Sequence, residues 1–86
     1  MATVPQFIKE VALELELSAE TAFIKNDKYV HIYYDTEKEG FIYNIYPFNQ
    51  ELIFDKDGKI KPQHIIKSNF CKTDEFVTVE NAYFNA

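Results

Sequence analysis

The chain has 86 residues, of which 47% are hydrophobic and 16% are aromatic, and its formal net charge is −5 at pH 7. A chain of this length and composition is expected to form one small globular domain, residues 1–86, and not a disordered tail. All nine of its basic residues are lysines. Because arginine is the residue that binds phosphates and guanines in a bidentate manner, and because the net charge is negative, we exclude nucleic acid as a partner.

The sequence carries no sign of membrane insertion or secretion. No apolar run approaches the roughly 20 residues that a spanning helix needs. The first residues, MATVPQFIKE, lack the basic region and apolar block of a secretory signal. The single cysteine, Cys71, excludes an internal disulfide. We therefore expect a cytoplasmic protein that does not contact a membrane.

The first regular segment is expected to be a helix from about Val4 to Leu17. Its apolar stripe follows a 3.6-residue period and consists of Phe7, Ile8, Val11, Ala12 and Leu15. The letters VALELEL also fit the alternation of a strand, so strand remains an alternative for residues 11–17. A helix is preferred because Ala, Glu and Leu are strong helix formers.

Residues 23–54 alternate in a way that predicts a meander of antiparallel strands. A two-residue turn at Asn26-Asp27 sets the first register, since both residue types tolerate the positive φ that such turns need. The loops DTEKEG and PFNQ set the next two registers. The expected cross-strand pairs are Lys25 with Lys28, Phe23 with Val30, Tyr34 with Phe41, Ile32 with Tyr43, Val30 with Ile45, Tyr46 with Glu51, Ile45 with Leu52, and Tyr43 with Phe54.

This register divides the side chains between two faces of the sheet. The predicted core face, which the helix would cover, carries Phe23, Val30, Ile32, Tyr34, Phe41, Tyr43, Ile45, Leu52 and Phe54. The second face is mixed and rich in aromatic residues, and it carries Ile24, Tyr29, His31, Tyr33, Ile42, Asn44, Tyr46, Glu51 and Ile53. The expected fold class is α+β, with an N-terminal helix packed on one face of a four- to five-stranded antiparallel β-meander.

The segment after the meander is less regular. A type I turn in DKDG, with Gly58 in the left-handed conformation, adds a bulge that brings Ile60 opposite Phe54. Pro62 either breaks the strand or begins a short helix that runs through residues 65 and 66. Residues Glu75 to Val79 alternate again and predict a further strand whose place in the sheet is open.

No catalytic or metal-binding motif stands out. If IFDKDGKIKPQH is aligned with a calcium loop on Gly58, Ile53 and His64 occupy the first and twelfth positions, where carboxylates are required. One cysteine and two histidines are too few for zinc at short spacing. Cys71 is expected to be a small buried hydrophobe and not a nucleophile. The prediction is a protein without enzymatic activity, cofactor or metal.

Two groups of residues suggest how the protein acts. The predicted partner-binding residues on the second face are Tyr29, His31, Tyr33, Asn44 and Tyr46, because tyrosines around a polar centre are typical of protein-binding surfaces. The predicted acidic patch consists of Glu10, Glu14, Glu16 and Glu20. Whether the second face is exposed or covered by another layer stays open.

Two functions follow from these residues. The first is a small acidic binding protein that occupies another, basic protein or pairs with a second copy of itself. Inhibitors, antitoxin or immunity proteins, and phage or mobile-element counter-defence factors belong to this class. The alternative is a small-molecule sensor or an accessory subunit of a larger enzyme complex, with a pocket near His31. Acidic residues contiguous with the tyrosines would favour the first function, and a pocket walled by Tyr29, Tyr33 and Tyr46 would favour the second.

Overall fold

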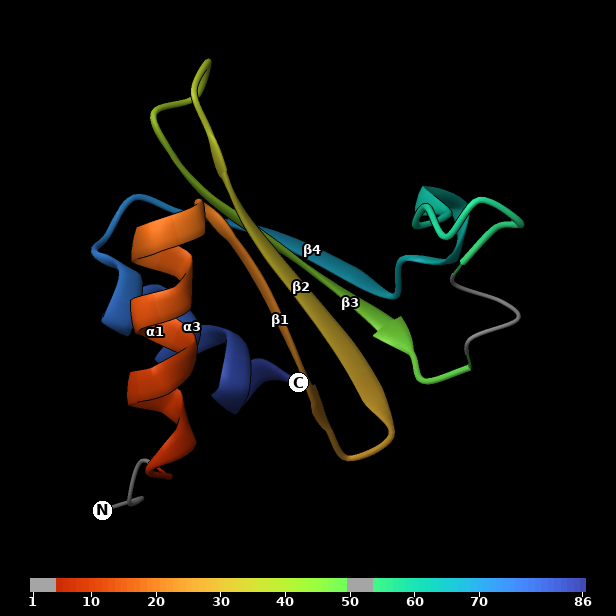
Figure 1. The fold of residues 1–86 in the computed structure, drawn as a ribbon, viewed down its shortest axis with the longest axis horizontal. Helices are drawn as coiled ribbons and strands as arrows, with labels where there is room; N and C mark the ends of the chain where they lie inside the picture. The colour runs from red at the N-terminus through yellow and green to blue at the C-terminus, as the bar shows by residue number, and fades with distance from the viewer. Residues whose placement is uncertain (1–4, 50–53) are drawn as a thin grey trace.

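The computed structural model describes residues 5–49 and 54–86. Its elements are the helix α1 (Phe7–Ser18), the strands β1 (Glu20–Lys25), β2 (Lys28–Asp35) and β3 (Gly40–Pro47), the 3-10 helix η1 (Pro62–His64), the strand β4 (Lys67–Cys71) and the helix α3 (Glu75–Asn85). The strands form one antiparallel sheet in the order β1-β2-β3-β4. Both helices lie on the same side of this sheet (Figure 1). The expected α+β class with a strand meander is confirmed.

Residues 11–17 form part of helix α1, as preferred, and not the alternative strand. Ile8, Ala12 and Leu15 recur at helical spacing and are all buried against the sheet. Leu17, which does not fit the stripe, is 77% exposed. The helix ends at Ser18, one residue later than expected, and the predicted start at Val4 lies outside the described residues.

The two hairpins have the predicted registers. Asn26 and Asp27 both have positive φ angles, of 51° and 59°, as the two-residue turn requires. The confirmed pairs are Lys25 with Lys28, Phe23 with Val30, Tyr34 with Phe41, Ile32 with Tyr43, and Val30 with Ile45. The second hairpin begins to close at Asp35, whose carboxylate accepts hydrogen bonds from the next turn, at 2.9 Å from Glu37 N and 3.1 Å from Lys38 N.

The predicted pairing of β3 with the residues that follow it is wrong. Strand β3 pairs with β4, residues 67–71, so that Tyr43 lies opposite Asn69 and not opposite Phe54. The other predicted partners, Glu51 and Leu52, fall outside the described residues. Phe54 instead forms a bridge with Ile60, as the turn chemistry of DKDG predicts. The glycine of that turn has a φ of 78°. The alternation of apolar residues identifies a strand but does not specify the strand beside which it lies. Here β3 pairs with β4, more than 20 residues away in the sequence, and not with the residues that directly follow β3.

The Phe70 ring of β4 lies over a glycine in the neighbouring strand. A Cβ atom at Gly40 would lie 2.5 Å from this ring, which is 45% exposed, so a larger residue here would require the ring to shift. Between β2 and β4, strand β3 is buried from residue 40 to residue 46. It is one of the two inner strands of the sheet.

Residues 75–79 form the first turns of a helix and not the predicted strand. Asp74 caps this helix, because its carboxylate accepts a hydrogen bond of 2.8 Å from the Val77 amide. Val79 and Ala82 are fully buried against the sheet and α1. The alternation of EFVTV was misleading because the same apolar residues also fit a helix that continues through Ala82.

The core therefore lies between the sheet and two helices, whereas the sequence indicated one. Its buried members are Ile8, Ala12, Leu15, Phe23, Val30, Ile32, Phe41, Tyr43, Ile45, Val79 and Ala82. Helix α3 is tied to the sheet by Asn85, whose Nδ2 donates to the Tyr43 hydroxyl at 3.0 Å. Tyr34 was predicted in this core but is 40% exposed. The end of the β2–β3 hairpin, where Tyr34 lies, projects beyond the helices that cover the core (Figure 1).

Candidate functional site

The predicted partner-binding residues lie together on the face of the sheet opposite the helices. Tyr29 pairs with Tyr46, and His31 pairs with Asn44, as the sequence indicated. Tyr33 follows on the same face of β2 and stacks on His31, with ring centroids 5.4 Å apart and an interplanar angle of 28°. The register alone thus brings all five residues onto one surface.

The face is partly covered. Tyr46 is 2% exposed and Asn44 is 7% exposed, whereas Tyr29, His31 and Tyr33 are half-buried. The sequence left open whether this face is exposed or covered, and the structure shows both. The β3 side of the face is buried as a second, smaller core, and the β2 side remains accessible.

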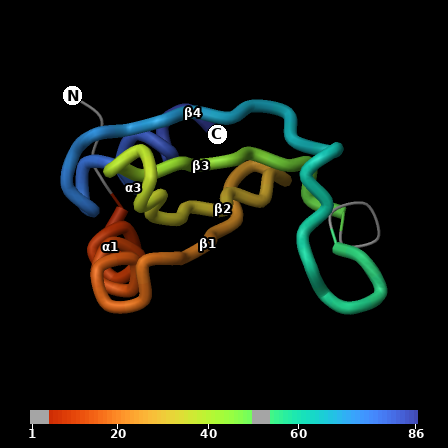
Figure 2. Tube along the Cα trace, turned by 90° about the horizontal axis from the view of Figure 1, so that it is seen from above, coloured from red at the N-terminus to blue at the C-terminus, as the bar shows by residue number. Residues whose placement is uncertain are grey.

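Residues after the described gap contribute to this cover. Seen in Figures 1 and 2, residues 54–66 lie on the side of the sheet away from the helices. Phe54 lies edge-on to Tyr29, with centroids 5.5 Å apart and an interplanar angle of 73°. The carboxylate of Asp55 holds the turn by accepting hydrogen bonds from the amides of Asp57 and Lys59, at 2.8 and 2.9 Å. The sequence placed Phe54 in the helix-side core, so this contact is a correction.

The polar groups of the face have defined partners. Ser68 donates a hydrogen bond of 2.6 Å from its hydroxyl to Asn44 Oδ1. Burial raises the pKa of Tyr46, and a hydrogen bond from Asn44 offsets part of that rise. His31 Nε2 lies 3.1 Å from the Glu20 carboxylate. Burial and, to a smaller degree, the Glu20 charge also raise the pKa of Tyr29, so these phenols are neutral hydrogen-bonding groups at physiological pH.

A hollow of about 320 Å³ opens beside this face, and we call it the β1 hollow. Its lining consists of Glu14, Glu20, Thr21, Ala22, Tyr29, His31, Phe54, Gly58 and Ile60. Two of the predicted acidic residues therefore adjoin two of the predicted partner-binding residues. Tyr33 and Tyr46 are not part of the lining.

The predicted acidic patch is divided between two surfaces. Glu14 and Glu20 line the β1 hollow, whereas Glu16 lines a separate groove between α1 and α3. Glu10 is exposed in the first turn of α1 and lines neither of them. Because residues on a helix point in directions 100° apart, acids close in sequence need not share a face.

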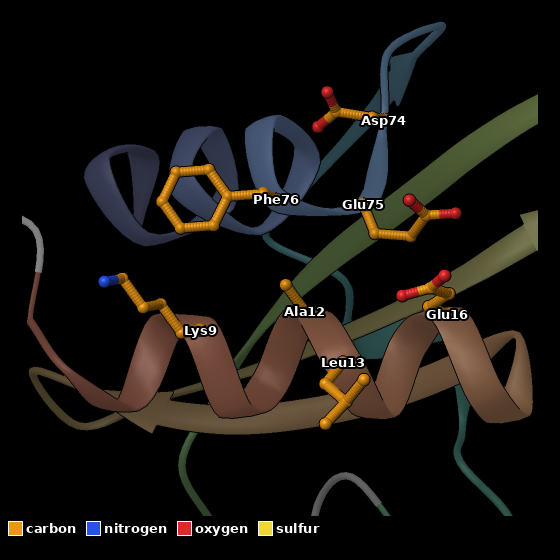
Figure 3. Close-up of a pocket in the computed structure, with 7 residues that line it drawn as sticks. All are labelled: Lys9, Ala12, Leu13, Glu16, Asp74, Glu75 and Phe76. Carbon is orange, nitrogen blue, oxygen red and sulfur yellow. The ribbon is translucent and has the colours of Figure 1, made fainter.

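The groove between the helices has a volume of about 510 Å³ and is lined by Lys9, Ala12, Leu13, Glu16, Asp74, Glu75 and Phe76. In Figure 3 the carboxylates of Glu16 and Glu75 lie near one end, and Lys9 lies toward the other. The sequence analysis did not predict this groove because it assigned residues 75–79 to a strand. Asp74, a good N-cap residue before an apolar helical pattern, could have indicated the helix α3 and with it the groove.

Cys71 does not have the environment of a catalytic thiol. The residue is half-buried at the end of β4, where it packs against the core. Burial raises the pKa of its thiol, with a smaller opposing effect from a hydrogen bond donated by the Asn81 side chain. A thiol with a raised pKa is protonated at neutral pH and is a poor nucleophile.

We expect calcium and zinc to leave the stability of the protein unchanged. Among residues 5–49 and 54–86, no group of three His, Cys, Asp or Glu side chains is arranged to hold a metal ion. A thermal melt with and without each metal tests this expectation. A metal that binds only the folded state stabilises it by about 2.7 kcal/mol at a hundredfold excess over its dissociation constant. A rise of several degrees in the melting temperature would therefore contradict the prediction.

Comparisons with models of protein families, with curated proteins and with solved structures find no match for this chain. In the part of the chain that the structure describes, no helix is both long and apolar enough to cross a membrane.

Proposed function

We propose that this protein is a small acidic, non-catalytic module that acts by binding and occupying another protein. Inhibitors, antitoxin or immunity proteins, and counter-defence factors of phages or mobile elements act in this way. The observation that carries the proposal is the β1 hollow, where Glu14 and Glu20 are contiguous with Tyr29 and His31. Acidic and aromatic side chains on one continuous surface suit a basic protein partner.

The overall charge supports the same partner. A net charge of −5 accelerates the encounter with a basic protein and slows the encounter with an acidic one. The half-buried side chains of Tyr29, His31 and Tyr33 supply contact area at little cost in conformational entropy. The single cysteine is consistent with action in the cytoplasm.

A small-molecule sensor, or an accessory subunit of an enzyme complex, is the second candidate. The β1 hollow lies beside His31, and its volume of about 320 Å³ falls at the lower end of the range for ligand pockets, about 300–1,000 Å³. However, Tyr33 and Tyr46 do not line the hollow. It therefore has fewer aromatic side chains around it than we expect for the binding pocket of a small-molecule sensor.

The test is capture of the partner from a lysate of the organism that carries the gene. We expect the wild-type protein to retain a specific protein and the double variant Glu14→Gln/Glu20→Gln to lose it. Glu37→Gln/Glu39→Gln is a matched control, because it removes the same charge from exposed residues in the turn between β2 and β3. Thermal melts establish that all three proteins are folded.

Two other results would contradict the proposal. Equal capture by both double variants would remove the β1 hollow from the binding surface. A small molecule retained in native mass spectrometry, with no captured protein, would favour the sensor. The mass of the purified protein in solution tests the homodimer: a dimer that Glu14→Gln/Glu20→Gln dissociates would make a second copy of the chain the partner.

A further inference from the structure

The lining of the β1 hollow combines negative charge with aromatic rings. Glu14 comes from α1 and Glu20 from the first position of β1, while Tyr29 and Phe54 supply rings that meet edge to face. The Glu20 side chain is 65% exposed, so its carboxylate is accessible to a partner. This combination is the one that recognises an organic cation.

The charge of the hollow is only partly compensated within the described residues. Its lining includes no lysine, and His31, which contacts Glu20, is the one lining side chain there that can become positive. The C-terminal end of α1 lies two residues before Glu20, and no basic residue stands in its last turn. The partial negative charge of the helix end therefore adds to that of the carboxylates.

Thr21 lines the hollow from the other face of β1. It pairs with Ile32 and is 4% exposed, so its side chain points toward the helices and away from Tyr29 and His31. The groups that face a ligand on the Tyr29 side are therefore the carboxylates and the rings.

We propose that the β1 hollow takes up an arginine side chain of the partner protein. This inference rests on the proposed function and specifies how the partner is recognised. A guanidinium group carries five N–H donors in one plane, enough to serve both carboxylates. Its flat faces stack on aromatic rings, and its aliphatic stem can pack against Phe54 and Ile60.

The chain already uses a contact of this kind elsewhere. Lys25 Nζ lies 3.9 Å from the centroid of the Tyr83 ring and donates a hydrogen bond to the Tyr83 carbonyl oxygen. The β1 hollow has aromatic rings and carboxylate acceptors that could hold a cation in the same way. The chain itself contains no arginine that could occupy the hollow. A hollow of about 320 Å³ is of a size to hold one long side chain.

Three short peptides test the inference on the full chain. Each places one residue between glycines: arginine, lysine, or citrulline, which keeps the shape of arginine without its charge. Binding is followed by NMR through the backbone amides of the isotope-labelled protein. We expect the arginine peptide to bind most tightly, the lysine peptide less tightly and the citrulline peptide least. The shifts should centre on residues 20–22, 29–31 and 58–60.

The two double variants place the binding site. Glu14→Gln/Glu20→Gln should weaken binding of the arginine peptide by about tenfold or more, because charge-assisted hydrogen bonds are lost. Glu37→Gln/Glu39→Gln should bind as the wild type does. Equal binding of the arginine and citrulline peptides would overturn the proposal. So would shifts that map onto the groove between α1 and α3, or lysine binding as tightly as arginine.

The arginine inference and the proposed function fail in different ways. If a partner is captured through Glu14 and Glu20 but the arginine peptide neither binds nor competes with it, the function stands and the arginine inference is wrong. If the peptide binds as expected but no protein is captured, the chemistry of the hollow stands and the proposed function is wrong.

Discussion

Replacing Ile32 with alanine is expected to lower the free energy of unfolding by about 2–5 kcal/mol. Ile32 is 0% exposed in the middle of β2, where it faces the helices and pairs with Thr21 and Tyr43. Removing its side-chain carbons leaves a cavity between the sheet and the helices, and the surrounding side chains can fill it only in part. Urea denaturation, monitored by circular dichroism, measures the change.

The matched control is Ile24→Ala on the neighbouring strand. Ile24 lies on the opposite face of the sheet and is 52% exposed, so the same truncation there should change the stability by about 0.5 kcal/mol or less. A similar loss in both variants would mean that the two faces have not been assigned correctly.

Replacing Tyr46 with alanine is expected to destabilise the protein by about 3–5 kcal/mol, the range found for large buried aromatic side chains. Tyr46 is 2% exposed on the face away from the helices, and its ring lies 6.2 Å from that of Tyr29. Tyr34→Ala serves as the control, because Tyr34 is 40% exposed near the end of the hairpin. Thermal and urea melts of both variants give the comparison.

The Tyr46 experiment separates a packing role from a recognition role. A folded Tyr46→Ala protein of unchanged stability that no longer captures a partner would show that Tyr46 belongs to the recognition surface and not to a second core. The structure leads us to expect the reverse at this position. Tyr29, His31 and Tyr33 are half-buried and are the residues of this face left to contact a partner, and the first two line the β1 hollow.

The sequence predicted the candidate site in part. The period of two along β2 and β3 placed Tyr29, His31, Tyr33, Asn44 and Tyr46 on one face, because side-chain direction in a strand depends only on register. It could not predict which of them would be covered. That depends on contacts with segments distant in the sequence, such as Phe54 against Tyr29 and Ser68 on Asn44, which the period of two does not specify.

The acidic residues were also predicted only in part. Their number and their position in the N-terminal part of the chain are visible in the sequence. Helix geometry separates Glu14, on the β1 hollow with Glu20, from Glu16, and the packing of α3 against α1 places Glu16 in a groove with Asp74 and Glu75. The alternating letters of residues 75–79 concealed that helix, because short apolar runs fit both periods.

The sequence by itself determined the local structure of this protein: the helix α1, the turn at Asn26-Asp27, the registers of the first two hairpins and the bridge between Phe54 and Ile60. Each depends on residues close together in the chain, where turn chemistry and side-chain period act directly. Only the tertiary structure decided that β4 lies beside β3, that a second helix covers the core, and that Tyr46 is buried. These outcomes depend on contacts between distant segments, where several partners offer similar burial and the packing of the whole domain selects one.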